Sequence, residues 1–328
     1  MGSTPVLPTV RHEVAVSDGD RIILHEDKPP AWRTGQPAML LIHGLTGCHA
    51  APYMLRMAQR FFDQGVRVYR MDMRGSGAGM DAASQLTHAG RSDDVIAALG
   101  TVAKQTAARI ADPAQESVSG QIAGPVAQAG AVAEAGPIWA TGISLSANQL
   151  LRAAGRIGAG LQERPVWFDR IKRIAAVAPP LDLAQCSKNM NRLSRRFYNR
   201  YFIHWLLKRI PSQVRTRDDF QRALAGPRPR TLWQLDDRFT APLSGFRDAA
   251  DYYEQSSAIA VTRHNPIETL VLTAKDDPLV PIECFTEPGD IWPESTCLHV
   301  TPTGGHVGFI NRHGRSWMDD ALLSWFCA

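Results

Sequence analysis

Several features that mark other classes of protein are missing from this chain of 328 residues. No apolar run reaches the roughly 18 residues that a membrane-spanning helix needs. The first ten residues have neither the charged start nor the apolar stretch of a secretory signal. The five cysteines are odd in number, widely spaced and without a Cys-x-x-Cys pair, which argues against a disulfide framework or a zinc site. We therefore expect reduced thiols, no metal site and a cytoplasmic location.

Charge is modest in total but uneven along the chain. The formal net charge is +4, and we expect no nucleic-acid partner. Between residues 192 and 233, however, there are eleven Lys or Arg residues and only two acidic residues. This stretch therefore carries +9 and leaves −5 for the remainder, an asymmetry that predicts a basic face on one part of the fold.

Short apolar runs alternate with helical patterns over most of the chain. Buried strands are expected at 38–43, 66–71, 138–143, 171–177, 267–273 and 296–301, with a hairpin around Asp18-Gly19. Helices are expected at 53–61, from Val95 to Ile110 behind the N-cap run Ser92-Asp93-Asp94, after residue 148, and at 317–326. This alternation predicts an α/β protein with a mostly parallel sheet and helices on both faces.

The stretch 183–257 interrupts the alternation. It has a helical pattern and is basic and rich in aromatic residues. We interpret it as an inserted helical cap, with core parts at 1–182 and 258–328. The stretch 111–136 is rich in Ala, Gly, Gln and Ser, and we expect it to continue a helix and then form a flexible surface excursion.

A serine lies between a predicted strand and a predicted helix in the segment 138–148, which reads IWATGISLSAN. A strand-to-helix turn of this kind exposes a nucleophilic hydroxyl and directs free helix N–H groups toward it. Ser144 is therefore the candidate nucleophile. The alternative is a turn without chemistry, because the usual glycine two residues downstream is replaced by Ser146.

A nucleophilic serine needs a base, and the base needs an acid that orients it. Asp276 and Asp277 follow one predicted strand, and His306 follows the next, between glycines. In hydrolases with such a turn the chain order is Ser, acid, His. We prefer Asp277 as the acid because Pro, two apolar residues and Pro follow it, while Asp276 would be a surface or loop-capping residue. Each element alone could be a structural turn, but all three in this order indicate catalysis.

The oxyanion of an acyl-transfer reaction needs N–H donors. The backbone N–H groups of Leu45, in HGLTG at 43–47, and of Leu145, next to the nucleophile, are the candidates. His43 is expected to hold the loop. The glycine-rich loop 74–79 resembles a dinucleotide motif, but its spacing is not that of a phosphate cradle.

With these motifs the chain resembles the YheT-like branch of the α/β-hydrolases, which includes animal ABHD lipid hydrolases and yeast ethyl-ester synthase/esterases. The resemblance runs from about residue 38 to the C-terminus. The matching stretches are HGLTG at 43–47, APYM at 51–54, RMDMRGSGAG at 70–79, THAGRSDDV at 87–95, GISLSAN at 142–148, PPLDL at 179–183, RFYNRYF at 196–202, FTAPLSGFRDAADYY at 239–253, AKDDPLVP at 274–281 and GGHVGF at 304–309. Ser146 and Ala147 depart from it, because this branch has paired glycines there.

The resemblance implies an α/β-hydrolase fold, with Ser144 as nucleophile, Asp277 as acid, His306 as base, and Leu45 and Leu145 as oxyanion donors. It also implies a carboxylic ester hydrolase for short- to medium-chain acyl esters, including lipid esters, without a cofactor. Acyl transfer to an alcohol would use the same residues, and a non-catalytic binding protein is the alternative from another class. The sequence does not indicate an oligomeric state.

The cap carries aromatic residues at helical spacing between residues 192 and 208. We expect its apolar side to cover Ser144 and form the acyl pocket, with Trp205 as a substrate-binding residue. A basic, aromatic helix can also contact an anionic lipid surface. We favour an ordinary cap helix, packed on the core by one face with its arginines solvated, over such peripheral membrane contact.

Overall fold

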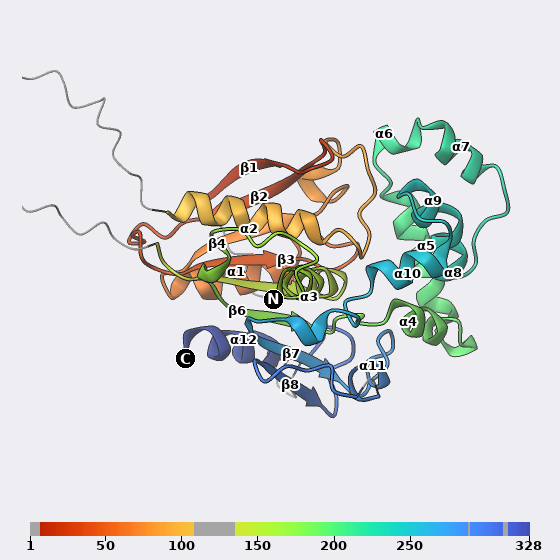
Figure 1. Ribbon diagram of the computed structural model, residues 1–328. Helices are drawn as coiled ribbons and strands as arrows, with labels where there is room; N and C mark the ends of the chain where they lie inside the picture. Colours follow the sequence, from red (N-terminus) through yellow and green to blue (C-terminus); the bar gives the residue numbers. More distant parts are fainter. Residues whose placement is uncertain (1–6, 108–134, 288, 311–313) are drawn as a thin grey trace, which may run out of the picture.

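The computed structural model describes residues 7–107, 135–287, 289–310 and 314–328. Its centre is an eight-stranded sheet in the order β1-β2-β4-β3-β5-β6-β7-β8 (Figure 1). The strands are β1 (Thr9–Ala15), β2 (Arg21–Asp27), β3 (Ala38–Ile42), β4 (Arg67–Asp72), β5 (Ile138–Ile143), β6 (Ile171–Val177), β7 (Glu268–Ala274) and β8 (Thr296–Thr301). The pairs β1–β2 and β2–β4 are antiparallel, and all the other pairs are parallel.

The central strands are apolar because helices cover both faces of the sheet. Every residue of β3 and β4 is buried, whereas most of β1, at the edge, is exposed. Continuous apolar runs are typical of parallel strands that are buried on both faces. The predicted hairpin and all six predicted strands are present, so the expected α/β-hydrolase architecture is confirmed.

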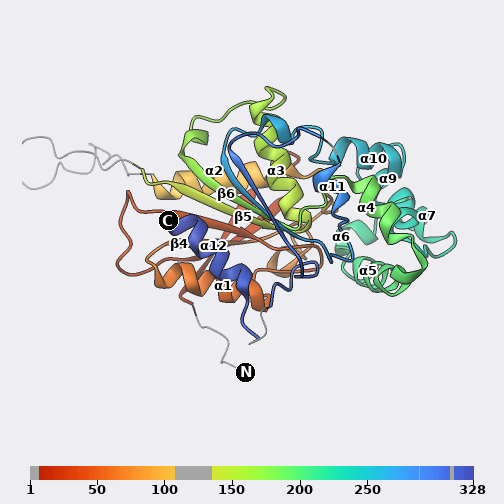
Figure 2. The ribbon, with the colours of Figure 1, turned by 90° about the horizontal axis from the view of Figure 1, so that it is seen from below.

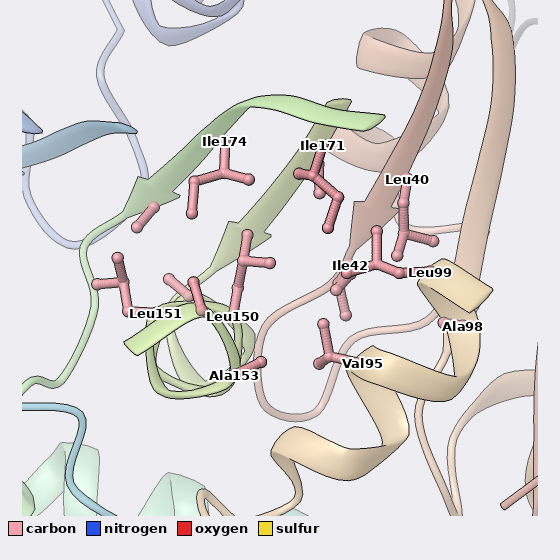
Figure 3. Close-up of a cluster of buried hydrophobic side chains, with 14 of the residues drawn as sticks. Leu40, Ile42, Val95, Ala98, Leu99, Leu150, Leu151, Ala153, Ile171 and Ile174 are labelled. Carbon is pink, nitrogen blue, oxygen red and sulfur yellow. The ribbon is translucent and has the colours of Figure 1, made fainter. Parts of the chain in front are cut away.

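Two helices pack on each face. Helices α1 (Pro52–Asp63) and α12 (Trp317–Cys327) cover one face, and α2 (Ser92–Thr106) and α3 (Leu145–Gly158) cover the other (Figures 1 and 2). On the second face, side chains of β3, α2 and α3 meet in one core, which Figure 3 shows through Leu40, Leu99 and Leu150. Full burial of each such leucine contributes about 1.5–3 kcal/mol.

One helix start was predicted wrongly. Ser92 is already helical, and Arg91 occupies the cap position without a capping side-chain bond. The Ser92 hydroxyl instead accepts a hydrogen bond from Arg152 of α3 at 2.5 Å, so a tertiary contact uses the oxygen that would have capped the helix. The predicted excursion at 111–136 lies almost entirely outside the described residues.

The segment between β6 and β7 contains helices joined by loops and lies beyond one end of the sheet (Figure 1). Its helices are α4 (Leu183–Met190), α5 (Arg196–Lys208), α6 (Ser212–Arg215), α7 (Asp218–Leu224), α8 (Leu232–Leu235), the π-helical turn η5 (Asp236–Thr240), α9 (Ala241–Leu243) and α10 (Ala249–Ser256). We call this segment, residues 183–257, the cap. The cap also contains the 3-10 turn η4 (Leu193–Arg195), and the described part of the core contains α11 (Glu283–Thr286) and the 3-10 turns η1 (Gly77–Gly79), η3 (Phe168–Arg170) and η6 (Thr262–His264). The division of the chain into a cap and two core parts remains a prediction.

No helix in the described part of the chain is long and apolar enough to cross a membrane.

Candidate active site

Three side chains from the ends of parallel strands meet in one hydrogen-bonded chain. Ser144 follows β5, Asp277 lies in the loop after β7, and His306 lies in the loop after β8. The Ser144 hydroxyl is 2.7 Å from His306 Nε2, and His306 Nδ1 is 2.8 Å from Asp277 Oδ2. A carboxylate can only accept, so Nδ1–H donates to Asp277 and leaves the Nε2 lone pair for the serine proton. This is the arrangement that a Ser-His-Asp nucleophile requires.

The backbone at Ser144 is strained in the manner of a nucleophile elbow. Ser144 has φ +56° and ψ −117°, a region that costs a non-glycine residue on the order of 1–3 kcal/mol. Gly142 makes the close approach of helix and strand possible: a Cβ there would lie 2.6 Å from Ser146 O and 2.7 Å from Ala147 Cα. Any larger residue at 142 would push α3 away from β5.

Ser146, the departure from the family pattern, fits the elbow. Its side chain is fully buried. The hydroxyl accepts from the Ile143 N–H at 2.8 Å and lies 2.8 Å from the Ile42 carbonyl oxygen, to which it donates. Serine at this position therefore links the nucleophile turn to the end of β3 with a satisfied hydroxyl.

The two neighbouring aspartates have different partners. The second oxygen of Asp277 accepts from the N–H groups of Leu279 and Val280, at 2.8 and 3.1 Å. Asp276 Oδ1 accepts from the N–H groups of Gly304 and Gly305, at 2.9 and 2.8 Å. Asp277 thus contacts the imidazole, whereas Asp276 holds the loop that carries it, the loop-capping role expected for Asp276.

The residues of the two candidate oxyanion donors, Leu45 and Leu145, line the same cavity as Ser144. Within the described residues, the N–H groups of Leu45 and Leu145 donate to no acceptor. A Cβ on Gly44 would lie 3.3 Å from Ser144 Cβ, so the loop after β3 approaches the serine closely. Two free N–H groups beside a nucleophile can bind a developing oxyanion.

His43 holds this loop from its buried side. It is fully buried, and burial lowers the pKa of its imidazole, which is therefore neutral. Its Nε2 accepts from the Met73 N–H at 3.3 Å, and its Nδ1 donates to the Gly44 carbonyl at 2.8 Å. The structure thus places His43 in the loop-holding position expected from the sequence.

Sequence reasoning missed a second support, centred on Asp72 at the end of β4. Asp72 Oδ2 accepts from His25 Nε2 at 3.0 Å and from His49 Nδ1 at 2.6 Å, and Oδ1 accepts from the His49 N–H at 2.6 Å. Burial alone would raise the pKa of Asp72, but the bonds from both histidines hold it well below its usual range. These three residues are also a possible ligand group for a metal ion. Mutual hydrogen bonds already account for their arrangement, and the carboxylate anchors the loop that contains His49.

A third residue that holds the loop after β3 comes from the cap, and the sequence analysis did not predict it either. The guanidinium of Arg209 donates from Nη1 to the Thr46 carbonyl and lies 3.4 Å from the Gly47 carbonyl oxygen. Thr46 has φ +65°, another left-handed position in a non-glycine residue. The cap therefore holds the loop that contains Leu45, one of the two candidate oxyanion donors, directly, across 163 residues of sequence.

A cavity of about 150 Å³ opens onto Ser144 and His306. Its walls are mainly apolar, and they come from both the core and the cap: Leu45, Leu145, Leu183, Cys186, Met190, Phe202, Leu206, Leu232, Leu279 and Val280. The volume lies below the 300–1,000 Å³ typical of small-molecule sites. Its size and lining suit a short apolar chain.

Trp205 does not line this cavity. Helix α5 presents Phe202 and Leu206 to it instead. Trp205 faces a separate groove on the cap, where its ring lies 5.0 Å from Lys208 Nζ and 5.5 Å from Arg209 Cζ. The expectation that Trp205 lines the acyl pocket is therefore corrected: α5 does line the cavity, but through Phe202 and Leu206.

A sequence model described as the alpha/beta hydrolase family matches residues 39–315. The chain belongs to the α/β-hydrolase family. The YheT protein of Escherichia coli (strain K12), whose name assigns it provisionally to the esterases, is 25% identical over 320 residues, covering 94% of this chain and 82% of that protein. This similarity confirms the predicted YheT-like branch.

Two further similarities are to proteins whose names describe enzymes that act on esters. Monoacylglycerol lipase of Saccharomyces cerevisiae (strain ATCC 204508 / S288c) is 30% identical over 165 residues, 47% of this chain and 36% of that protein. The esterase Pf2001 of Pyrococcus furiosus has the same fold, with a TM-score of 0.55 and 14% identity over 97% of this chain and 93% of that one. The coarse functional class, a carboxylic ester hydrolase, agrees with the sequence-based prediction.

Proposed function

We propose that this hydrolase cleaves short- to medium-chain acyl esters through an acyl-enzyme on Ser144. The observation that carries the proposal is the continuous hydrogen-bonded chain from Ser144 through His306 to Asp277. Ser144, at one end of this hydrogen-bonded chain, lines a small apolar cavity that can hold the acyl chain.

In the first half-reaction, Ser144 Oγ attacks the acyl carbon while its proton moves to His306 Nε2. The oxyanion is held by the N–H groups of Leu45 and Leu145, and each donor supplies on the order of 3 kcal/mol of transition-state stabilisation. The imidazolium then protonates the leaving alkoxide as the ester C–O bond breaks. Asp277 keeps the imidazole in the required tautomer and stabilises its positive charge.

In the second half-reaction, a water molecule attacks the acyl-enzyme. His306 takes the water proton and returns it to Ser144 Oγ, which leaves as the free hydroxyl. The products are the carboxylic acid and the alcohol. If an alcohol replaces water, the same steps yield a new ester, so hydrolysis and acyl transfer share every residue named here.

The test is hydrolysis of p-nitrophenyl esters from acetate to decanoate, with and without ethanol. The proposal predicts highest kcat/KM for the shorter half of the series, and free acid as the main product in water. A dominant ethyl ester at low ethanol concentration would favour the acyltransferase. Absence of turnover for the whole series, with no acyl-enzyme by mass spectrometry, would favour a non-catalytic binding protein.

A further inference from the structure

Helix α5 has two contrasting sides. One side is occupied by the buried Asn199 and Ile203 and by Phe202 and Leu206, which line the catalytic cavity. The opposite side is exposed, although its centre is aromatic: Phe197 is 86% exposed. An ordinary cap helix buries its apolar residues and solvates its charges, and α5 does this on one side only.

The cap holds most of the large apolar side chains that are exposed in the described part of the chain. Six of the large apolar side chains that are exposed within the described residues lie in the cap, namely Leu193, Phe197, Tyr198, Tyr201, Leu224 and Trp233. Leu193 is 81% exposed and lies in η4, just before α5 and one helical turn ahead of Phe197 in the sequence. Exposed apolar side chains that gather in one region mark an interaction site.

Cationic side chains flank the aromatic residues. A groove of about 1690 Å³ on the same region of the cap is lined by Arg196, Arg200, Arg228 and Arg230 together with aromatic residues of α5. Within the described part of the chain, these four arginines form no ion pair with a carboxylate. Asp237 is the one acidic residue among those that line the groove, and its carboxylate accepts from the Ala249 N–H.

We propose that the outer side of α5, with Phe197 and Tyr201, the preceding Leu193, and Arg196 and Arg200 at the edge of this side, docks this hydrolase on an anionic lipid surface. Bulky apolar side chains enter the boundary between headgroups and acyl chains, and Arg or Lys at their edges binds anionic headgroups. The other side of the same helix lines the catalytic cavity, so docking places that cavity beside the lipid phase.

Charge distinguishes this occupant from a second copy of the chain. The stretch 192–233 carries eleven basic and two acidic residues, so a symmetric contact through this patch would bring two strongly positive surfaces together. An anionic lipid surface instead neutralises them, with an attraction that weakens as salt shortens the Debye length.

The experiment is co-sedimentation of the full chain with vesicles, carried out with the Ser144→Ala variant so that binding is measured independently of catalysis. The vesicles are phosphatidylcholine alone, or equal amounts of phosphatidylcholine and phosphatidylserine. We expect binding to the anionic vesicles, about tenfold or more weaker binding to the neutral ones, and loss of binding at high salt.

Two double variants and one control separate the contributions. Phe197→Ser with Tyr201→Ser, and Arg196→Glu with Arg200→Glu, should each weaken binding about tenfold or more. Val166, a fully exposed apolar residue outside the cap, is the matched control, and Val166→Ser should bind as the parent does. When the same substitutions are made in the active protein, which keeps Ser144, each variant should hydrolyse a soluble p-nitrophenyl ester at the parent rate. This result verifies that the variants are folded.

Several results would overturn the proposal. They are equal binding to neutral and anionic vesicles, binding that survives both double variants, and no binding to vesicles while a polyanionic nucleic acid binds. A change from dimer to monomer in the aromatic variant, without vesicle binding in the parent, would instead make the patch an interface between copies.

Discussion

The contact of Arg209 with the oxyanion loop gives the most informative substitution in this protein. In Arg209→Ala, the Thr46 carbonyl loses its cationic donor, a hydrogen bond of a kind that contributes about 1.5–3 kcal/mol. The left-handed Thr46, at φ +65°, then lacks the contact that opposes relaxation of the loop. Because Leu45 precedes Thr46, relaxation moves a candidate oxyanion donor away from the acyl oxygen.

The expected loss is confined to kcat. Complete removal of one oxyanion donor lowers kcat about 10²–10³-fold, so a loop that is displaced but still present should lower it about ten- to a hundredfold. KM should change less than about twofold, since Arg209 does not line the catalytic cavity and uniform substrate binding is retained. Arg209→Lys, which keeps one donor and the charge, should recover part of the rate.

The assay is steady-state hydrolysis of p-nitrophenyl butyrate, with kcat and KM determined separately. Arg215→Ala is the matched control, because the Arg215 guanidinium donates to the carbonyls of Ile210, Leu207 and Lys208 within the cap. It should lower thermal stability without a selective loss in kcat. A wild-type kcat in Arg209→Ala, or an equal loss in Arg215→Ala, would refute the positioning role.

Three further predictions follow from the site. Asp277→Asn should lower kcat by about 10⁴-fold, whereas Asp276→Asn should have a much smaller effect, and kinetics with the reverse ranking would reassign the acid. Phe202→Ala should shift the preference in the p-nitrophenyl series toward longer acyl chains, while Trp205→Ala should leave the profile unchanged; the opposite pattern would restore Trp205 as the pocket residue. Burial raises the pKa of Asp236 to about 6, so its charged form destabilises the fold above that pH by up to about 3 kcal/mol relative to an ordinary aspartate. Asp236→Asn should therefore raise the melting temperature at pH 8 and lose this advantage near pH 4, and an equal shift at both pH values would contradict the assignment.

The fold was predictable because its signals are local and strong. The run that became β3 is apolar at every position, and the structure buries all five residues. The order of Ser144, Asp277 and His306, each just after a predicted strand, predicts that they lie at one edge of a parallel sheet. The predicted start of α2 was wrong because the Ser92 hydroxyl accepts a hydrogen bond from Arg152 instead of capping the helix. No local sequence pattern encodes that contact.

The orientation of the cap was harder to predict for a related reason. Helical spacing joins Phe202 with Leu206, but it joins Phe197 with Tyr201 and Trp205 equally well. Which side meets the cavity depends on where the helix lies against the core, a tertiary property. The bonds from Arg209 to the loop after β3 and from His25 to Asp72 also connect distant residues, so single-sequence patterns could not reveal them.

The measurement that tests the central claim most directly is mass spectrometry after brief exposure to a fluorophosphonate, which modifies activated serine nucleophiles. The account predicts one adduct per chain, located on the peptide that contains Ser144, with loss of esterase activity in proportion to labelling. It also predicts no adduct in Ser144→Ala and much slower labelling in a His306→Ala variant. Full esterase activity in Ser144→Ala, or an inactivating adduct on a different residue, would contradict it.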